Sequence, residues 1–359
     1  MNDRLRRCRE IVDALRLDAI LITDPVDVRY LSSFRGDDTT LIIGRDVALI
    51  CTDSRYWEQV HEEVVGFELS KVAGADLLAH SVAAVGEQVG ATARLGFQGS
   101  QISHAGYRSL RRLHGGGLRD VRSRVTLLRS VKEDGELAIM RRAAAVTAEA
   151  VSAVAGRGLV GRRERDVAWD IAREFHRLGA QGEAFATIVA AGDHGAHAHA
   201  LPGDRVIAAG ELVVIDTGAR VDGYCSDITR TFAAGEVDDE QRRMYEVVLA
   251  AQLAGLAAVR AGAHGRDDVD AAARAVISDA GFGDRFGHGT GHGVGMAIHE
   301  APTLGHTRGD RLQAGMVCTV EPGIYIEGVA GVRIEDTVLV TSSGCERLTT
   351  SSKDLLIVD

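Results

Sequence analysis

The sequence predicts two domains, an α/β domain at residues 1–128 and an α+β domain with an internal repeat at residues 130–359. The chain has 359 residues, 45% of them hydrophobic, which is enough for two packed cores. Short strand-like runs alternate with helical stretches in the first part of the chain. In the remainder, a pair of helical stretches precedes strand-like segments twice, as expected for an internal repeat.

The first domain has strand-like runs at AILIT, residues 19–23, and at the hairpin-like TTLIIGRDVALICTD, residues 39–53. A polar helical stretch follows Tyr56. The histidines of this domain stand singly among polar or small residues, so we expect them to be solvated and to carry no chemistry: His61, His80, His104 and His114.

The second domain begins with SVKE, where Ser130 and Glu133 have the spacing of a capping box. This pair predicts a helix from Ser130 to about Val154, and we place the domain boundary at its start. A second helix is expected over about residues 162–178, because apolar residues recur there on one face and Gly179 follows.

The order of helices and strand-like segments then repeats within the second domain. Helical stretches at about residues 238–260 and 266–280 introduce the second copy. The segments HALPGDRVIAAGELVVID, residues 199–216, and HEAPTLGHTRGDRLQAGMVCTVE, residues 299–321, both run from a histidine through GDR and an Ala-Gly pair to an apolar run that ends in an acid. This recurring order predicts two similar halves, each of two helices and a sheet, related by a pseudo-twofold axis.

Each half continues past its acidic residue into a hairpin that returns with a second one. Asp216 and Asp227 flank the turn dipeptide Asp222-Gly223. Residues placed symmetrically about a turn lie opposite each other, with Cβ atoms about 5 Å apart. We therefore expect Asp216 to face Asp227, with a one-residue bulge in the hairpin. Acidic residues near turns are also common on protein surfaces, which is the alternative for any single pair.

Glu321 and Glu335 repeat this arrangement around Gly328. Four carboxylates brought together by strand pairing repel each other unless protons or cations neutralise them. Together with one imidazole, they form an oxygen-rich site for two divalent ions of the manganese, cobalt or iron kind. The two acidic pairs therefore predict a dinuclear metal centre.

The stretch GHGTGHGVGMAIHE, residues 287–300, supplies the imidazole. In a strand its odd-numbered glycines form one bare face, and the other face carries four side chains: His288, Thr290, His292 and Val294. A phosphate cradle would instead require a glycine-rich turn that opens a helix, and that context is missing. We expect a closely packed strand with histidines facing a site.

Composition narrows the class of protein. A formal net charge of −10 and only 4% aromatic residues argue against nucleic-acid binding, so a small molecule or a peptide is the expected substrate. The five cysteines form no CxxC pair, which indicates reduced, packed thiols. Charged residues interrupt the apolar run that follows the basic N-terminus, so no signal peptide or membrane span is expected. These observations predict a cytoplasmic protein that binds no membrane.

Taken together, the motifs resemble a known family. IDTGARVDGYCSDITRTF, HGTGHGVGMAIHE, EPGIYI and GVRIED look like the motif set of the pita-bread metallopeptidases, which include aminopeptidase P, prolidase and methionine aminopeptidase. This resemblance covers residues 130–359. DPVDVRYLSSFRG and TDSRYWEQ, within residues 1–128, are similar to the creatinase-like N-terminal domain of aminopeptidase P and prolidase, which methionine aminopeptidases lack.

The resemblance implies a ligand set when it is carried over position by position. Asp227 and Glu335 would bridge two divalent ions, Asp216 would complete one site, and His292 with Glu321 would complete the other. Mn²⁺ is the expected metal, with Co²⁺ or Zn²⁺ as alternatives.

The resemblance also implies roles in catalysis. Glu321 would accept the proton of the attacking water, and Tyr325 and Arg333 would support the site and its proton transfers. His197 matches no position of the family. The histidines that match substrate-contacting or pocket-lining positions are His199, His288 and His299.

The implied function is metal-dependent hydrolysis of the bond between an N-terminal residue and proline. YLSSFRG and TDSRYWEQ look like the short bacterial form of aminopeptidase P, so an Xaa-Pro aminopeptidase is expected, with an Xaa-Pro dipeptidase (prolidase) as the alternative. A metal-free amidinohydrolase like creatinase and a non-catalytic binding module both fit poorly with a complete ligand set. A di-iron oxidase would carry its ligands on helices. The expected partners are a peptide with proline in second place and a second copy of the chain.

Overall fold

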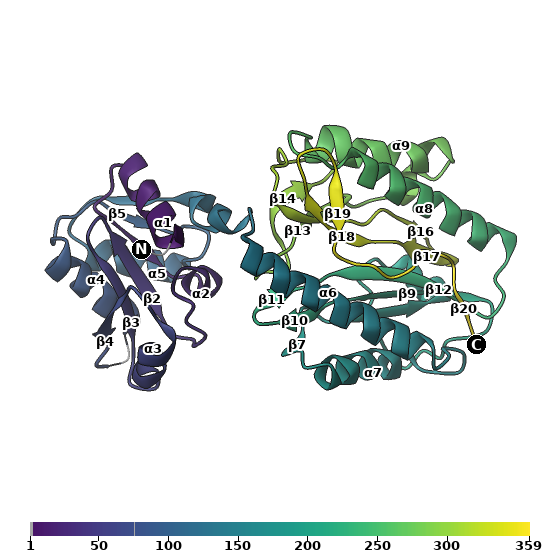
Figure 1. The fold of residues 1–359 in the computed structure, drawn as a ribbon, viewed down its shortest axis with the longest axis horizontal. Helices are drawn as coiled ribbons and strands as arrows, with labels where there is room; N and C mark the ends of the chain where they lie inside the picture. The colour runs from purple at the N-terminus through teal and green to yellow at the C-terminus, as the bar shows by residue number, and fades with distance from the viewer. Residues whose placement is uncertain (1–2, 75) are drawn as a thin grey trace. The chain divides into compact units, whose positions relative to one another are not determined.

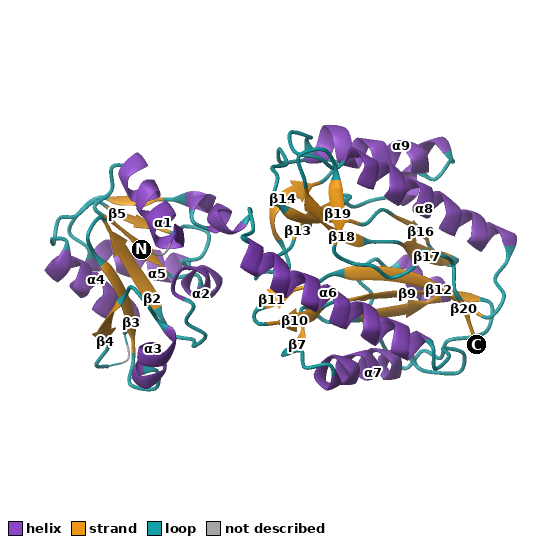
Figure 2. Cartoon of the chain, viewed as in Figure 1, coloured by secondary structure: helices purple, strands orange, loops and turns teal. Residues whose placement is uncertain are grey.

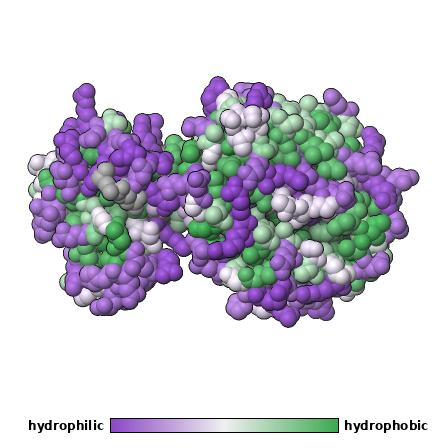
Figure 3. All heavy atoms as spheres, in the orientation of Figure 1, coloured by the Kyte–Doolittle hydropathy of each residue, from purple (hydrophilic) through white to green (hydrophobic). Residues whose placement is uncertain are grey.

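The computed structural model describes residues 3–74 and 76–359, and the chain divides into two compact units between Arg129 and Ser130 (Figure 1). Helices and strands alternate in the first unit, whereas the second has long helices outside and strands between them (Figure 2). On the face shown in Figure 3, hydrophobic residues occur in small groups among hydrophilic ones. None of the described helices combines the length and the apolar character needed to cross a membrane.

The first unit is built on one six-stranded sheet with the order β4-β3-β2-β1-β5-β6. The expected strand at 19–23 and the expected hairpin at 39–53 are both present, and a helix follows Tyr56. The elements are α1 (Asp3–Ala14), β1 (Ala19–Ile22), α2 (Pro25–Ser32), β2 (Thr40–Gly44), β3 (Ala48–Thr52), α3 (Trp57–Glu63), β4 (Glu68–Lys71), α4 (Leu77–Gln88), β5 (Leu95–Phe97), α5 (His104–Leu113), β6 (Leu118–Asp120) and the 3₁₀ turns η1 (Arg122–Arg124) and η2 (Thr126–Arg129).

The histidines of this unit are not all solvated. His61 and His104 are exposed, but His80 is half-buried and lies 2.9 Å from the Ser70 hydroxyl. The expectation is wrong for His114, which is buried with its Nε2 2.7 Å from the carbonyl oxygen of Ala93. Because this residue caps the end of α5, its ring turns inward and satisfies a backbone group.

The second unit contains these elements: α6 (Asp134–Ala155), α7 (Glu164–Arg177), β7 (Gly182–Glu183), β8 (Ile188–Ala191), η3 (Gly192–Ala196), β9 (Glu211–Thr217), β10 (Ala219–Val221), β11 (Tyr224–Cys225), β12 (Ile228–Ala234), α8 (Asp239–Ala258), the π-helical turn η4 (Gly265–Asp270), α9 (Ala271–Asp279), η5 (Gly283–Arg285), β13 (Gly291–Gly293), β14 (Glu300–Leu304), β15 (Val317–Val320), β16 (Gly323–Ile326), β17 (Ala330–Arg333), β18 (Asp336–Val340), β19 (Cys345–Arg347) and β20 (Ile357–Val358).

The predicted repeat is visible in the strand topology. One sheet has the order β20-β12-β9-β8 and another the order β14-β13-β15-β18-β19. In each sheet the strand that leads to the first acidic residue, β9 or β15, pairs antiparallel with an earlier and a later strand. Helices α6 and α7 pack on the first half and α8 and α9 on the second, with the strands between the two helix pairs (Figure 1).

The start of α6 differs from the prediction. Its N-cap is Glu133, which forms a capping box with Glu136, so the helix begins four residues after the expected Ser130. The backbone N–H of Lys132 donates to the carbonyl of Gly315 at 2.8 Å, and Val131 forms a β-bridge in the same region. These contacts hold the chain extended up to Glu133, and helical geometry is possible only after it.

The first hairpin also corrects a prediction. β9 and β12 pair with Asp216 opposite Thr229, not opposite Asp227. The two central residues of the turn, Asp222 and Gly223, both have positive φ, as a two-residue type I′ turn requires. That turn fixes one continuous register through β10 and β11, so no bulge is needed. Asp227 therefore lies diagonally across from Asp216 on the same face, at a typical distance of about 7–8 Å between Cα atoms.

The second hairpin follows the predicted register. β16 pairs with β17 and β15 with β18 in one common register, Gly323 opposite Arg333 and Val320 opposite Asp336. Glu321 and Glu335 occupy the corresponding opposed positions between the two ladders. Gly328, at the centre of the turn, has a φ of 72°, a value that a residue with a side chain adopts only with strain.

Candidate metal centre and substrate cavity

A cavity of about 570 Å³ opens in the second unit where the ends of β9, β13 and β15 meet the segment before β18. Most of the residues singled out from the sequence line it: Asp216, Asp227, His292, Glu321, Glu335, His199, His288, His299 and Arg333. Tyr325 does not line the cavity but is hydrogen-bonded to two residues that do.

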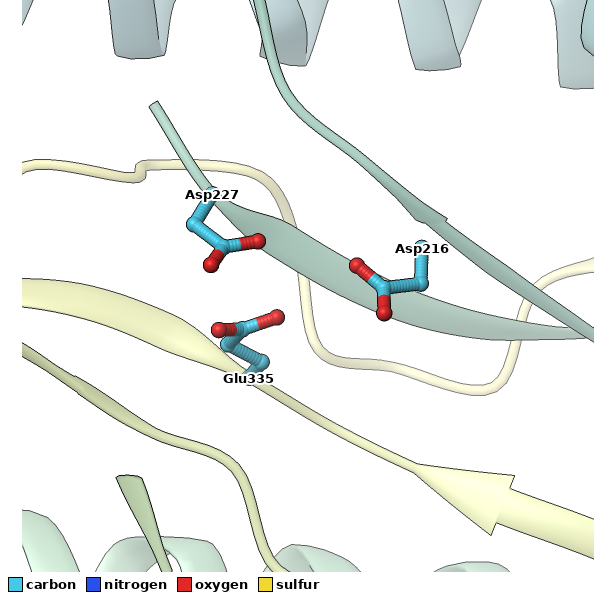
Figure 4. A group of neighbouring side chains, drawn as sticks. All are labelled: Asp216, Asp227 and Glu335. Atoms are coloured by element: carbon cyan, nitrogen blue, oxygen red, sulfur yellow. The ribbon is translucent and has the colours of Figure 1, made fainter. Parts of the chain in front are cut away.

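Three carboxylates converge at the floor of this cavity. Asp216 is near the end of β9, Asp227 precedes β12 and Glu335 precedes β18. One carboxylate oxygen from each lies within 4.8 Å of the other two. Figure 4 shows Glu335 reaching from the segment just before β18 toward the two aspartates, which come from the neighbouring hairpin. Three oxygens at this separation can share a cation.

The remaining acid and the imidazole lie beside this group. His292 Nε2 is 3.3 Å from Glu321 Oε1 and 3.6 Å from Asp227 Oδ2. His292 Nδ1 is 3.1 Å from the carbonyl oxygen of Gly293, which suits an Nδ1–H donor. The lone pair of Nε2 is then directed at the carboxylates, the orientation of a metal-ligating histidine. The structure thus brings all five sequence-predicted ligands together.

Electrostatics indicate that these carboxylates need a cation. Asp216 Oδ1 and Glu335 Oε1 are buried and have no hydrogen-bond partner among the described residues. Burial, and then repulsion from neighbouring carboxylates, raises the pKa of Asp227 and of Glu335 well above the usual range. Burial also raises the pKa of Glu321. Buried acceptors without donors are costly, and a divalent cation satisfies them and removes the repulsion. The donor set, four carboxylates and an imidazole, fits such an ion.

Arg333 links one acid of the cluster, Asp216, to His288 through Tyr325. Its Nη2 donates to Asp216 Oδ2 at 2.6 Å, and its Nη1 donates to the Tyr325 hydroxyl at 2.8 Å. That hydroxyl is also 2.9 Å from His288 Nε2. Burial raises the pKa of Tyr325 and lowers the pKa of His288, so both are neutral at neutral pH. These bonds form a continuous hydrogen-bonded chain from Asp216 to His288 at the edge of the cavity.

Two threonines position the acidic side chains, and neither is predicted as a site residue from the sequence. The Thr229 hydroxyl donates to Glu335 Oε2 at 2.8 Å and accepts from Arg333 Nε at 3.1 Å. The Thr319 hydroxyl donates to Glu321 Oε1 at 3.0 Å. Each threonine lies two residues from an acid that directly flanks its strand, so period-two alternation places both side chains on the same face. That spacing is the sequence feature that could have identified them.

The glycine-rich segment is only partly a strand. β13 covers just Gly291–Gly293, and Thr290 turns away from the cavity to bond Asp270 through both its N–H and its hydroxyl. The prediction that Thr290 shares a face with the histidines is therefore wrong, because Asp270 captures it and ends the alternation. The glycines do allow close packing: a Cβ at Gly291 would collide with the carbonyl of Thr319, and one at Gly293 with that of Ala301.

We expect the buried carboxyl groups of the metal-free protein to lose their contribution to stability as the pH rises above about 4. Carboxyl groups whose pKa is raised in the folded state bind more protons there than in the unfolded chain, so their stabilising contribution is complete below about pH 4 and is lost as the pH rises. Asp227, Glu321 and Glu335 are such groups. The cavity histidines have lowered pKa values, so they favour the folded state less only as the pH falls below about 6.5.

Urea unfolding of the chelator-treated protein at several pH values measures this effect. Saturating Mn²⁺ should reverse the slope, because the cation binds the ionised carboxylates. Glu335→Gln should flatten the slope in the metal-free protein. The same pH dependence in the metal-free wild type and in metal-free Glu335→Gln would contradict the assignment of a raised pKa to Glu335.

Comparison with known proteins agrees with this geometry. A model of the metallopeptidase family M24 matches residues 138–342, and one of the creatinase/prolidase N-terminal domain matches residues 4–131. The chain is 35% identical to the Xaa-Pro dipeptidase of Pyrococcus furiosus, over 99% of this chain and 100% of that protein.

Solved structures give the same answer. The Xaa-Pro dipeptidase from Bacillus anthracis superposes with a TM-score of 0.95 at 37% identity, covering 99% of both chains. The X-Pro aminopeptidase from Thermotoga maritima superposes with a TM-score of 0.89 at 32% identity, covering 97% of this chain and 100% of the other. These matches confirm the predicted combination of a creatinase-like and a pita-bread domain. The chain belongs to metallopeptidase family M24 and carries a creatinase/prolidase N-terminal domain ahead of its catalytic domain.

Proposed function

We propose that this metallopeptidase is an Xaa-Pro dipeptidase that uses two divalent metal ions. Family membership implies divalent metal ions, and the observation that carries the proposal is the convergence of five donor side chains in one cavity, with buried oxygens that lack donors. Mn²⁺ is the proposed metal, with Co²⁺ and Zn²⁺ as alternatives. A homodimer stays a prediction from the resemblance of the motifs, and a cytoplasmic location stays a prediction from the sequence pattern.

The chain's own residues divide into ligands and proton carriers. Asp227 and Glu335 would help to hold both ions, Asp216 would help to hold one of them, and His292 with Glu321 would help to hold the other. When bound, the ions supply Lewis acidity and a water of lowered pKa near neutral pH. Glu321, held by the Thr319 hydroxyl, would accept the proton of that water and deliver it to the leaving proline nitrogen.

The histidines would act on the substrate. The His299 ring lies edge-on to His292, with centroids 4.3 Å apart, at the wall of the cavity. Burial and the neighbouring His292 lower its pKa, so a neutral imidazole N–H is available to the developing oxyanion. His199 would hold the substrate backbone from the opposite loop, and His288 would complete the wall beside Tyr325.

A dipeptide is the preferred substrate for two reasons. The Xaa-Pro dipeptidases named above cover the whole chain at the higher identities, so the aminopeptidase expected from the first-domain motifs is not confirmed. Among the described residues lining the cavity, Arg308 and Arg333 are the cationic side chains, and Arg333 is bound to Asp216. Arg308 makes only a loose 4.0 Å contact with Asp310, and its guanidinium could bind the carboxylate of a dipeptide.

Substrate length tests the proposal. We expect the Mn²⁺-loaded protein to hydrolyse Ala-Pro and to leave Ala-Pro-Ala and Met-Ala-Ala uncleaved. In Arg308→Ala we expect KM for Ala-Pro to rise about tenfold, the loss of one charge-assisted bond. Arg266→Ala, an exposed arginine outside the cavity lining, is the matched control and should keep the wild-type KM. Efficient cleavage of Ala-Pro-Ala would favour the aminopeptidase instead.

A further inference from the structure

His199 lies in a loop, residues 192–203, whose two ends meet on one buried carboxylate. This carboxylate belongs to Glu164, the first residue of α7, which has a relative exposure of 0%. It accepts a hydrogen bond from the N–H of Ala191 at 2.9 Å, where the loop leaves β8, and one from the N–H of Gly203 at 3.4 Å, where the loop returns. Glu164 therefore ties the entrance and the exit of the loop together.

The same carboxylate also binds the first part of the loop, within η3, through His194. His194 Nδ1 lies 2.9 Å from Glu164 Oε2 and 3.0 Å from Oε1. The carboxylate can only accept, so Nδ1 carries the proton in this arrangement. Glu164 does not line the cavity, and the N-cap of α7 is Arg163, so capping does not explain the buried position of Glu164.

Two successive hydrogen-bonded turns connect His194 to the backbone around His199. The N–H of His197 donates to the His194 carbonyl at 3.1 Å, and the N–H of Ala200 donates to the His197 carbonyl at 3.1 Å. On the cavity side, Arg333 Nη1 donates to the carbonyl of Ala198 at 3.2 Å. The backbone on both sides of His199 is thus fixed from outside by the Glu164–His194 pair and from inside by Arg333.

We propose that Glu164 and His194 are positioning residues for substrate binding, which act by holding the loop of His199 in its binding conformation. This inference rests on the proposed function, because it takes His199 as a substrate contact. Without the pair, the loop would have to be ordered when the substrate binds, and affinity would fall. The contacts of Glu164 and His194 with this loop do not involve the acidic cluster. Metal binding and the chemical step would therefore be retained when the pair is removed.

The test is a double-mutant cycle in the Mn²⁺-loaded full-length protein. We expect His194→Ala to raise KM for Ala-Pro about tenfold with kcat changed less than about twofold, and His194→Asn, whose amide can still donate to Glu164, to restore KM. In a His199→Ala background, His194→Ala should add no further increase in KM. His176→Ala, an exposed histidine at the far end of α7, is the control with unchanged kinetics.

A measurement that needs no activity separates this inference from the proposed function. Amide hydrogen exchange of the metal-free protein should be faster within residues 192–203 in both His194→Ala and Glu164→Gln, with the rest of the chain unchanged. An unchanged KM in His194→Ala, or an equal increase in the His199→Ala background, would overturn the inference. The wild-type protein could cleave no Xaa-Pro peptide although the exchange result holds. In that case the proposed function is wrong, but the Glu164–His194 pair still orders residues 192–203.

Discussion

Glu335→Ala and Asp227→Ala should each abolish metal binding and peptide hydrolysis together. Each variant removes a carboxylate that would help to hold both ions, so neither ion keeps its full ligand set. Loss of metal assistance removes several kcal/mol of transition-state stabilisation, and kcat/KM for Ala-Pro should fall at least about a thousandfold. Elemental analysis after gel filtration measures the metal, and a ninhydrin assay of released proline measures the activity.

The matched control is Glu327→Ala, which removes an exposed carboxylate from the turn of the hairpin that carries Glu335. It should keep both metal and activity. The metal-free Glu335→Ala protein should also be no less stable than the metal-free wild type at pH 8, because one member of a repelling buried cluster is gone. A Glu335→Ala protein that retains two ions and full activity would show that the cluster is not the metal centre.

His299→Ala should separate chemistry from metal binding. The neutral imidazole is assigned to the developing oxyanion, and removal of one such donor typically lowers kcat about a hundredfold to a thousandfold. The metal content should stay at the wild-type level, because His299 is not among the five side chains that we propose as ligands. Single-turnover hydrolysis of Ala-Pro measures the chemical step directly.

His61→Ala, in an exposed position of the first unit, is the comparison variant for His299→Ala. It should behave as wild type in both assays. A metal-free His299→Ala protein would contradict the assigned role and would place His299 among the ligands. A variant that retains metal and has an unchanged kcat would show that another group stabilises the oxyanion.

The second acidic pair could be predicted from sequence because its geometry is local. Glu321 and Glu335 are equidistant from a turn glycine, and the observed ladders keep that register on both sides. For the first pair the centre of the hairpin does not lie midway between Asp216 and Asp227. The dipeptide Asp222-Gly223 requires a two-residue type I′ turn, which pairs Asp216 with Thr229. The turn chemistry by itself therefore predicts that Asp227 lies diagonally from Asp216 and that Thr229 lies opposite it.

Other parts of the site depend on contacts that no local pattern encodes. Thr290 leaves the face of the histidines because Asp270, twenty positions earlier in the chain, binds it. The loop of His199 is tied by Glu164, which sits one helix earlier and reads in the sequence as an ordinary helix-start residue. The proposed preference for a dipeptide rests on Arg308 in the cavity lining, a residue outside the first-domain motifs.

The most direct measurement of the central claim is metal stoichiometry combined with hydrolysis of Ala-Pro in one titration. The chelator-treated protein is titrated with Mn²⁺, and bound metal and released proline are followed at each step. We expect no hydrolysis without metal, saturation at two ions per chain, and activity that rises with occupancy. Full hydrolysis of Ala-Pro by protein shown to be free of metal, or two bound ions with no hydrolysis of any Xaa-Pro peptide, would contradict it.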